Sequence, residues 1–255
     1  MTSLTSAPGS RTLRRRITLF RALGMLSILV FAFALPNVIT PWVQVDFQGD
    51  GVIQPWRDGV EGSVDALVWI ALVGLVLDPL ARPIVGQLLV VVAAVAVTVV
   101  PAAGPAMAVT LVIILLPVIS YPALRRLRDL RAPDVHRGTM AVAVATSAVL
   151  LPLAVAAWSP SDNQAATYAE HLAVLALAGL VFSTRRPGWR WVAWPTAATW
   201  AYLGVVAIAH PDEIDSFGRL GGLACLATAA AFAALTVRTT EATRPPSSAR
   251  RPAER

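Results

Sequence analysis

The chain has 255 residues, of which 56% are hydrophobic and only 14% charged, and its formal net charge is +6. A soluble domain carries about 25% charged residues, so this composition excludes a water-soluble globular protein. The positive charge adjoins apolar stretches, where membrane topology and anionic lipid headgroups explain it better than nucleic acid does. The single cysteine, Cys225, excludes an intrachain disulfide and a CxxC redox pair.

Residues 1–21 are polar and basic, and they predict a cytoplasmic tail that is disordered as far as Arg16. The first apolar span covers about residues 22–40. Its basic start and the sequence Ala32-Phe33-Ala34 also fit a cleavable signal peptide. We favour an uncleaved anchor because the apolar stretch continues past that point to Ile39.

The rest of the chain alternates between apolar spans and short polar connections. Residues 41–65 form the longest predicted loop, which is acidic and is expected on the outer, non-cytoplasmic side of the membrane. The remaining spans are expected at about 64–80, 83–100, 106–122, 138–158, 166–183, 191–209 and 220–237. Each is close to the roughly 20 residues that a helix needs to cross a bilayer. We therefore predict an all-α domain of eight transmembrane helices over residues 22–237, followed by a disordered cytoplasmic tail over 238–255.

The arginine residues are distributed unequally between the loops and tails on the two sides of the predicted membrane domain. With the N-terminus in the cytoplasm, all but two of the 21 Arg residues fall on the cytoplasmic side; the exceptions are Arg57 and Arg219. Basic residues in short loops set the orientation of membrane helices, so both termini are predicted to be cytoplasmic. The absence of Lys suggests a GC-rich genome, and we expect a bacterial plasma membrane. Trp189, Trp191 and Trp194 are expected at the inner interface, and Trp56 near the outer one.

Two segments 105 residues apart resemble each other. The segment from Asp65 and the segment from Glu170 each begin with a carboxylate, continue through Gly-Leu-Val at Gly74 or Gly179, and soon reach an Arg-Pro pair. Both are the second span of a four-helix half, so the similarity predicts a parallel 4+4 repeat. Chance similarity between two Leu/Ala/Val-rich helices is the alternative.

Few ionisable residues fall within the apolar spans, which argues against a carrier with a carboxylate at its centre. The one polar constellation is expected on the outer face, where Glu170 and His171 begin one span and His210 and Asp212 follow the next. Imidazole and carboxylate groups suit a divalent metal or general acid–base chemistry. No HExxH spacing is present, and a solvated acidic rim is the alternative.

Small residues recur along the last span: Gly218, Gly221, Gly222, Cys225, Ala229 and Ala233. Such spacing lets helix backbones approach closely. It fits either homodimerisation or packing within the same bundle, and we favour packing within the bundle.

The leading functional hypothesis is a non-catalytic permease or accessory subunit of a transport system. Proline inside the apolar spans, at Pro117, Pro152 and Pro195, and a basic cytoplasmic loop at 125–137 that would suit an ATPase partner, motivate it. The alternatives are a membrane enzyme or metal-binding protein that uses the outer histidines, and a sensor or scaffold that uses the outer loop. No GxSxG motif, P-loop or cofactor motif occurs.

Overall fold

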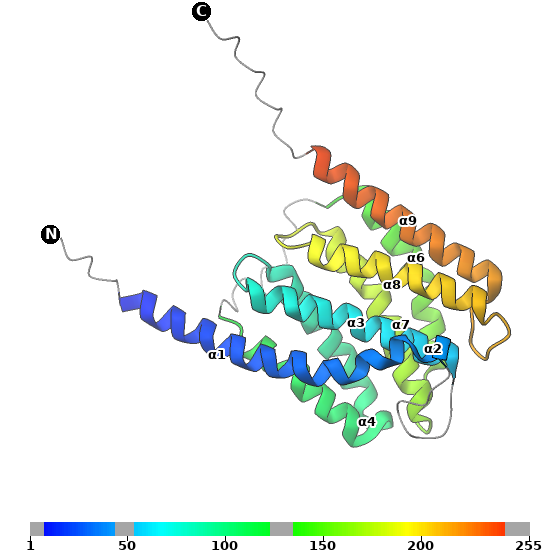
Figure 1. The fold of residues 1–255 in the computed structure, drawn as a ribbon, viewed down its shortest axis with the longest axis horizontal. Helices are drawn as coiled ribbons and strands as arrows, with labels where there is room; N and C mark the ends of the chain where they lie inside the picture. The colour runs from blue at the N-terminus through cyan, green and yellow to red at the C-terminus, as the bar shows by residue number, and fades with distance from the viewer. Residues whose placement is uncertain (1–7, 44–53, 123–134, 243–255) are drawn as a thin grey trace, which may run out of the picture.

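The computed structural model describes residues 8–43, 54–122 and 135–242, and every regular element in these ranges is helical. The prediction of an all-α chain is confirmed. In chain order the elements are α1 (Pro8–Phe31), the 3₁₀ helix η1 (Ala32–Val38), α2 (Thr40–Val43), α3 (Pro55–Leu77), α4 (Pro83–Ile119), α6 (Arg137–Ala157), α7 (Asn163–Ser183), α8 (Arg190–Ala209) and α9 (Gly218–Ala242) (Figure 1).

Six helical segments of the described chain are long and apolar enough to cross a membrane. They are Pro55–Leu77, Pro83–Val100, Arg137–Ala157, Asn163–Ser183, Arg190–Ala209 and Gly218–Arg238. This agrees with a multi-pass membrane protein. The bounds of α7, α8 and α9 lie within a few residues of the predicted spans.

Two segments that were predicted as tail or loop are helical instead. Helix α1 begins at Pro8, so residues 8–16, which were predicted as part of a disordered tail, are helical. Helix α3 begins at Pro55, so residues 55–65 of the predicted outer loop 41–65 belong to a helix. Proline suits the first position of a helix, and Asp58 in the first turn interacts favourably with the helix dipole. These two residues explain the early start of α3.

Helix α4 turns back on itself. A straight helix of its 37 residues would be about 55 Å long. However, the hydroxyl of Tyr121, just past its end, donates a hydrogen bond to the carbonyl of Pro79, just before its start. Leu111 also packs against a small cluster formed by Ala96, Val99 and Ala166. The chain therefore reverses within α4, between the stretches predicted as separate spans at about 83–100 and 106–122, and forms two antiparallel arms.

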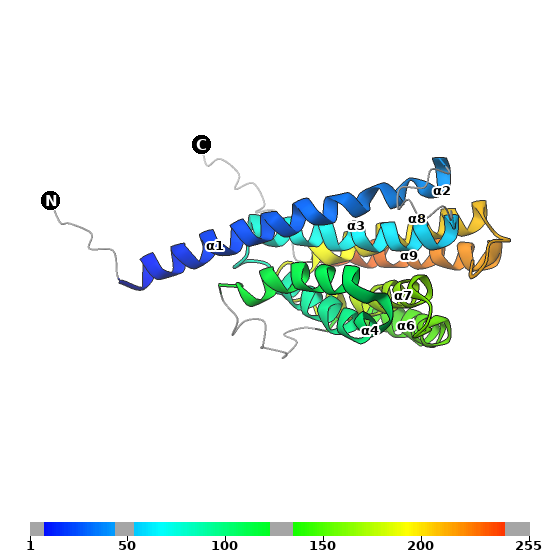
Figure 2. The same ribbon diagram turned by 90° about the horizontal axis from the view of Figure 1, so that it is seen from below.

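The helices form two layers (Figure 2). One layer contains α1, α3, α8 and α9, and the other contains α4, α6 and α7. Within the first layer, α3 packs on α8 and is covered by α1 and η1; within the second, α7 packs on α4 and is covered by α6. Helices α3 and α7 also contact each other across the layers.

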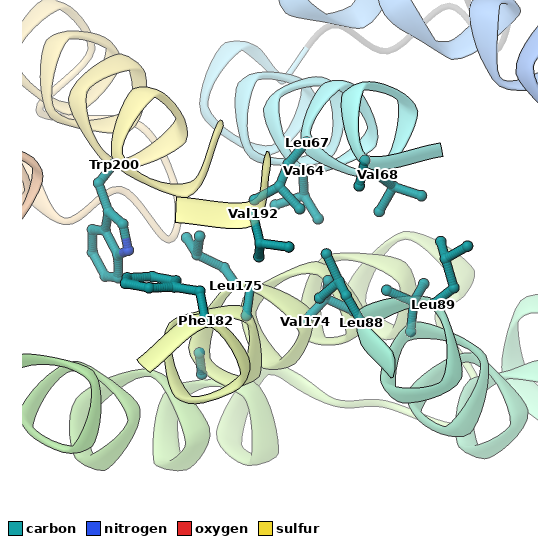
Figure 3. Close-up of a cluster of buried hydrophobic side chains, with 14 of the residues drawn as sticks. Val64, Leu67, Val68, Leu88, Leu89, Val174, Leu175, Phe182, Val192 and Trp200 are labelled. Atoms are coloured by element: carbon teal, nitrogen blue, oxygen red, sulfur yellow. The ribbon is translucent and has the colours of Figure 1, made fainter. Parts of the chain in front are cut away.

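The core lies between the two layers and is built from aliphatic and aromatic side chains (Figure 3). Its members include Val64, Leu67 and Val68 of α3, Leu88 and Leu89 of α4, Val174, Leu175 and Phe182 of α7, and Val192 and Trp200 of α8. Lipid tails are as apolar as these side chains, so close packing rather than escape from water holds such helices together.

Hydrogen bonds between helices supplement this packing. Ser27 Oγ of α1 donates to the carbonyl of Ile113 in α4 at 2.8 Å. Ser147 Oγ of α6 donates to the carbonyl of Ala176 in α7 at 2.9 Å. Trp69 Nε1 of α3 reaches back to α1 at 3.0 Å. Bonds of this kind join membrane helices at about 0.6 kcal/mol each.

Charged side chains collect at opposite ends of the bundle. At one end Arg21 donates to the carbonyls of Val76 and Leu77 at 3.2 and 3.1 Å, which satisfies the last turn of α3. At the other end Arg57 forms an ion pair with Asp215. Figure 1 shows the start of α1, the end of α9 and the α3–α4 and α7–α8 connections toward one end of the bundle.

Candidate functional site

Three ionisable side chains meet between α3 and α7. Asp65 lies ten residues after the start of α3 and twelve before its end, and so near mid-length. Glu170 and His171 follow seven and eight residues after the start of α7. Both helices begin earlier than the predicted spans do, so these residues lie within α3 and α7 and not in their first turns. That they mark the outer starts of their membrane spans stays a prediction.

His171 is held at both ring nitrogens. Its Nδ1 lies 2.7 Å from the carbonyl oxygen of Thr167, which only accepts hydrogen bonds, so Nδ1 carries a hydrogen. Its Nε2 lies 3.4 Å from Asp65 Oδ1. A carboxylate and a bare imidazole nitrogen repel each other, so this contact requires one proton between them, on either Nε2 or the carboxyl group.

Glu170 occupies an unusual position beside this pair. The residue is 6% exposed, and its Oε2 is buried without a hydrogen-bond partner. Burying a carboxylate without a partner is costly. A bound ligand or a proton on the carboxylate would offset this cost, and a functional role would explain why the residue is kept.

Glu170 lines two adjoining cavities. The first is small, about 120 Å³, and carries Glu61, Asp65, Thr167 and His171 on its wall, with apolar side chains completing it. A water occupies about 30 Å³ in the liquid, so this space suits a few waters or one small ion. The second, about 330 Å³, is apolar and lies between α4, α6 and α7; its wall includes Thr98 and Trp158.

A polar network joins the N-terminal parts of α3 and α7 to the α8–α9 connection. Trp56 Nε1 donates to the hydroxyl of Tyr168 at 3.0 Å, and that hydroxyl donates to the carbonyl of Asp215 at 3.3 Å. Arg57 Nε lies 2.9 Å from the Asp215 carboxylate. Trp56 is fully buried, so it does not face the outer interface as an aromatic belt residue would.

The other residues of the predicted metal set lie apart from this cluster. His210 Nε2 donates to the carbonyl of Pro41 at 3.0 Å, and its ring packs beside Trp42. Asp212 is exposed on the α8–α9 connection. Among the residues that the structure describes, no three His, Cys, Asp or Glu side chains are grouped so that they could hold a metal ion. The metal site of Glu170, His171, His210 and Asp212 stays a prediction without geometric support.

The small residues of α9 face different surroundings. A Cβ on Gly222 would lie 2.8 Å from the carbonyl of Gly204, and a Cβ on Gly204 would lie 2.8 Å from the carbonyl of Gly222, so α8 and α9 approach backbone to backbone here. Cys225 and Ala229 are buried in the same bundle. Gly218 begins the helix at φ +65°. These contacts are made within the chain.

No protein-family model, curated protein or solved structure matches this chain. The function of the chain is therefore inferred from the chemistry of its own residues.

Sequence reasoning missed the Asp65–His171 contact because Asp65 was assigned to a loop. Pro55 followed by Asp58 is a helix-start signal, and it would have placed Glu61 and Asp65 on one face of a helix. The contact itself spans 106 positions of the chain, and no local pattern reports it.

Proposed function

We propose that this chain is a membrane-embedded permease or accessory subunit of a transport system, and that Asp65, His171 and Glu170 form a proton-binding station within it. The observation that carries the proposal is that Asp65 and Glu170, the two carboxylates that begin the repeat-like segments, line the same cavity between α3 and α7. Ionisable groups inside membrane bundles commonly mark proton and ion pathways.

The contacts between helices support a parallel repeat. Exchanging the two halves pairs α1 with α6, α3 with α7, and the arms of α4 with α8 and α9. Under this exchange the contact of α3 with α8 becomes that of α7 with α4, and the contact of α1 with α4 becomes that of α6 with α9; all four contacts are present. Binding sites in repeat-built transporters lie at the interface between the halves, where the cluster lies.

The membrane placement that we propose has eight spans. The first would combine α1 with η1, and the fourth would be the second arm of α4, which lies against α1 through Ser27. The arginine bias places both termini in the cytoplasm, and we propose a bacterial plasma membrane as the location. The basic loop 125–137, for which an ATPase partner is proposed, lies mostly outside the described residues.

The chemistry of the cluster favours proton binding over metal binding. His171 and Asp65 share a proton by geometry, and Glu170 is a third group within the same cavity that is able to take one up. A buried carboxylate that gains or loses a proton changes the charge of the cavity. If the two conformations of a transporter bind that proton with different affinity, protonation shifts the equilibrium between them.

The test is charge movement in reconstituted membranes. The protein is purified from native membranes in mild detergent together with whatever remains bound, which mass spectrometry identifies. That preparation is reconstituted on a solid-supported membrane and exposed to steps of pH and, separately, of Na⁺. We expect a transient current after the pH step that Glu170→Gln and Asp65→Asn abolish.

The matched control is Asp212→Asn, which removes an exposed carboxylate that lies outside the cluster. It should keep the wild-type current. A wild-type preparation without any current, or a Glu170→Gln variant with an unchanged one, would refute the proposal. A current that appears only after the Na⁺ step would mean that the cluster binds a metal cation and not a proton.

A further inference from the structure

A second, unrelated site lies at the basic end of the bundle. We propose that it binds an anionic phospholipid, with the phosphate headgroup in a pocket between the α3–α4 and α7–α8 connections and an acyl chain in an adjoining groove along α8. The pocket has a volume of about 640 Å³, and its charged and aromatic wall consists of Asp78, Arg82, Arg185, Trp189, Arg190 and Trp191.

The charge of this pocket suits an anion. Three guanidinium groups line it against the single carboxylate of Asp78, which is exposed. Arginine presents a planar set of donors that matches phosphate oxygens. Basic pockets between transmembrane helices on the cytoplasmic side are a recognised setting for anionic headgroups.

The arginines are held in place before any ligand arrives. Arg82 donates through Nη1 to the carbonyl of Gly74, and its guanidinium lies 4.1 Å from the centre of the Trp191 ring. Arg185 and Arg190 lie 5.8 and 5.5 Å from the Trp189 ring. Side chains fixed by such cation–π contacts lose less conformational freedom when they bind.

A glycine brings the two connections together. Gly188 has φ +86°, a conformation that other residues rarely adopt, and a Cβ at this position would lie 2.8 Å from Cα of Arg82. The α7–α8 connection therefore passes directly against the α3–α4 connection. This close approach places arginines from segments about a hundred residues apart around one pocket.

The adjoining groove indicates a lipid rather than free phosphate. It has a volume of about 520 Å³ and shares Arg190 and Trp191 with the basic pocket. The rest of its wall is Ile70, Trp194, Pro195 and Ala198. The groove runs from the end of α8 toward the interior of the span. The charged pocket therefore matches the headgroup of a phospholipid, and the apolar groove matches its acyl chain.

The experiment is lipid titration with native mass spectrometry of the delipidated full chain. The probes are phosphatidylglycerol, phosphatidylcholine and inorganic phosphate. We expect one phosphatidylglycerol to bind with preference over phosphatidylcholine, and Arg190→Gln to weaken it about fivefold, which corresponds to one basic residue at a membrane surface. Arg190 is exposed, so its replacement leaves the fold unchanged.

Two further variants separate the alternatives. Arg219→Gln, at the opposite end of the bundle, should bind phosphatidylglycerol like the wild type. Trp194→Ala should weaken the lipid but leave any phosphate binding unchanged, because Trp194 lines only the groove. Equal binding of the two lipids, equal loss in Arg190→Gln and Arg219→Gln, or phosphate binding as tight as lipid binding would each overturn the proposal.

Discussion

His171 Nε2 lies 3.4 Å from Asp65 Oδ1, so an imidazole of α7 and a carboxyl group of α3 share one proton near mid-length of two contacting helices. Neither side chain is at a helix end, and both line the cavity that Glu170 also borders. This contact joins α3 to α7 through a shared proton.

The Asp65–His171 contact should appear as an energetic coupling. We expect Asp65→Asn and His171→Gln each to lower the free energy of unfolding, and the double variant to lower it by less than their sum. The expected coupling is about 0.5–3 kcal/mol, the range for residues in direct contact. Unfolding in mixed micelles measures all four proteins. A coupling of zero would mean that the contact does not form in solution.

Replacing Glu170 with Gln should stabilise the protein while it removes function. The buried Oε2 has no hydrogen-bond partner, and a carboxylate costs more to bury than a neutral amide does. We therefore expect Glu170→Gln to raise the free energy of unfolding by about 1–3 kcal/mol. Thermal unfolding followed by tryptophan fluorescence reports this change. Asp212→Asn serves as the control, and a lower melting temperature for Glu170→Gln would contradict the prediction.

The backbone contact between α8 and α9 leaves no room for a methyl group. We expect Gly222→Ala to cost about 1–3 kcal/mol, because its Cβ would meet the Gly204 carbonyl and force the helices apart. Ala227→Val, which adds volume on the exposed face of α9, is the control and should change stability little. A monomer–dimer measurement on both variants checks that the loss arises within one chain.

The stability of the polar network of Trp56, Tyr168, Arg57 and Asp215 should depend mainly on the Tyr168 hydroxyl. Tyr168→Phe removes the acceptor of the buried Trp56 Nε1, and leaving a buried donor unsatisfied costs about 1–3 kcal/mol. Asp215→Asn weakens a more exposed ion pair with Arg57, and we expect under about 1 kcal/mol. Chemical unfolding of the two variants compares these costs. The reverse order would mean that the ion pair, not the hydroxyl, fixes this end of α3.

The proposed orientation makes a labelling prediction. In a Cys225→Ala background, a cysteine introduced by Asp212→Cys should react with an impermeant maleimide in intact cells. One introduced by Arg14→Cys should react only after the membrane is opened. Both positions are exposed in the structure, so burial does not prevent the reaction. Labelling in the opposite order would reverse the assigned sides.

Sequence predicted the parts of the fold that hydropathy reports directly. The apolar stretches of α7, α8 and α9 define those helices because a bilayer requires about 20 apolar residues of each. The start of α3 was missed because Asp58, Glu61 and Asp65 give its first half the composition of a loop. In the structure Asp65 faces His171 and Glu61 lines the same cavity.

The candidate site was only half anticipated for a related reason. Glu170 and His171 were singled out, but their expected partner was His210, on the neighbouring span of the sequence. In the structure His210 instead donates a hydrogen bond to the carbonyl of Pro41, and the side chain that contacts His171 is Asp65. Which helices become neighbours is set by packing between the two layers, and the order of spans along the chain does not contain that information.

The reversal of α4 bears on how the chain enters a membrane. Its connection, residues 101–105, is Pro-Ala-Ala-Gly-Pro and carries no charge, so moving it across the bilayer requires no desolvation of an ionised side chain. Leu111 of the second arm packs against a small cluster that includes Ala96 and Val99 of the first arm. The pair is therefore suited to insertion as one preformed hairpin.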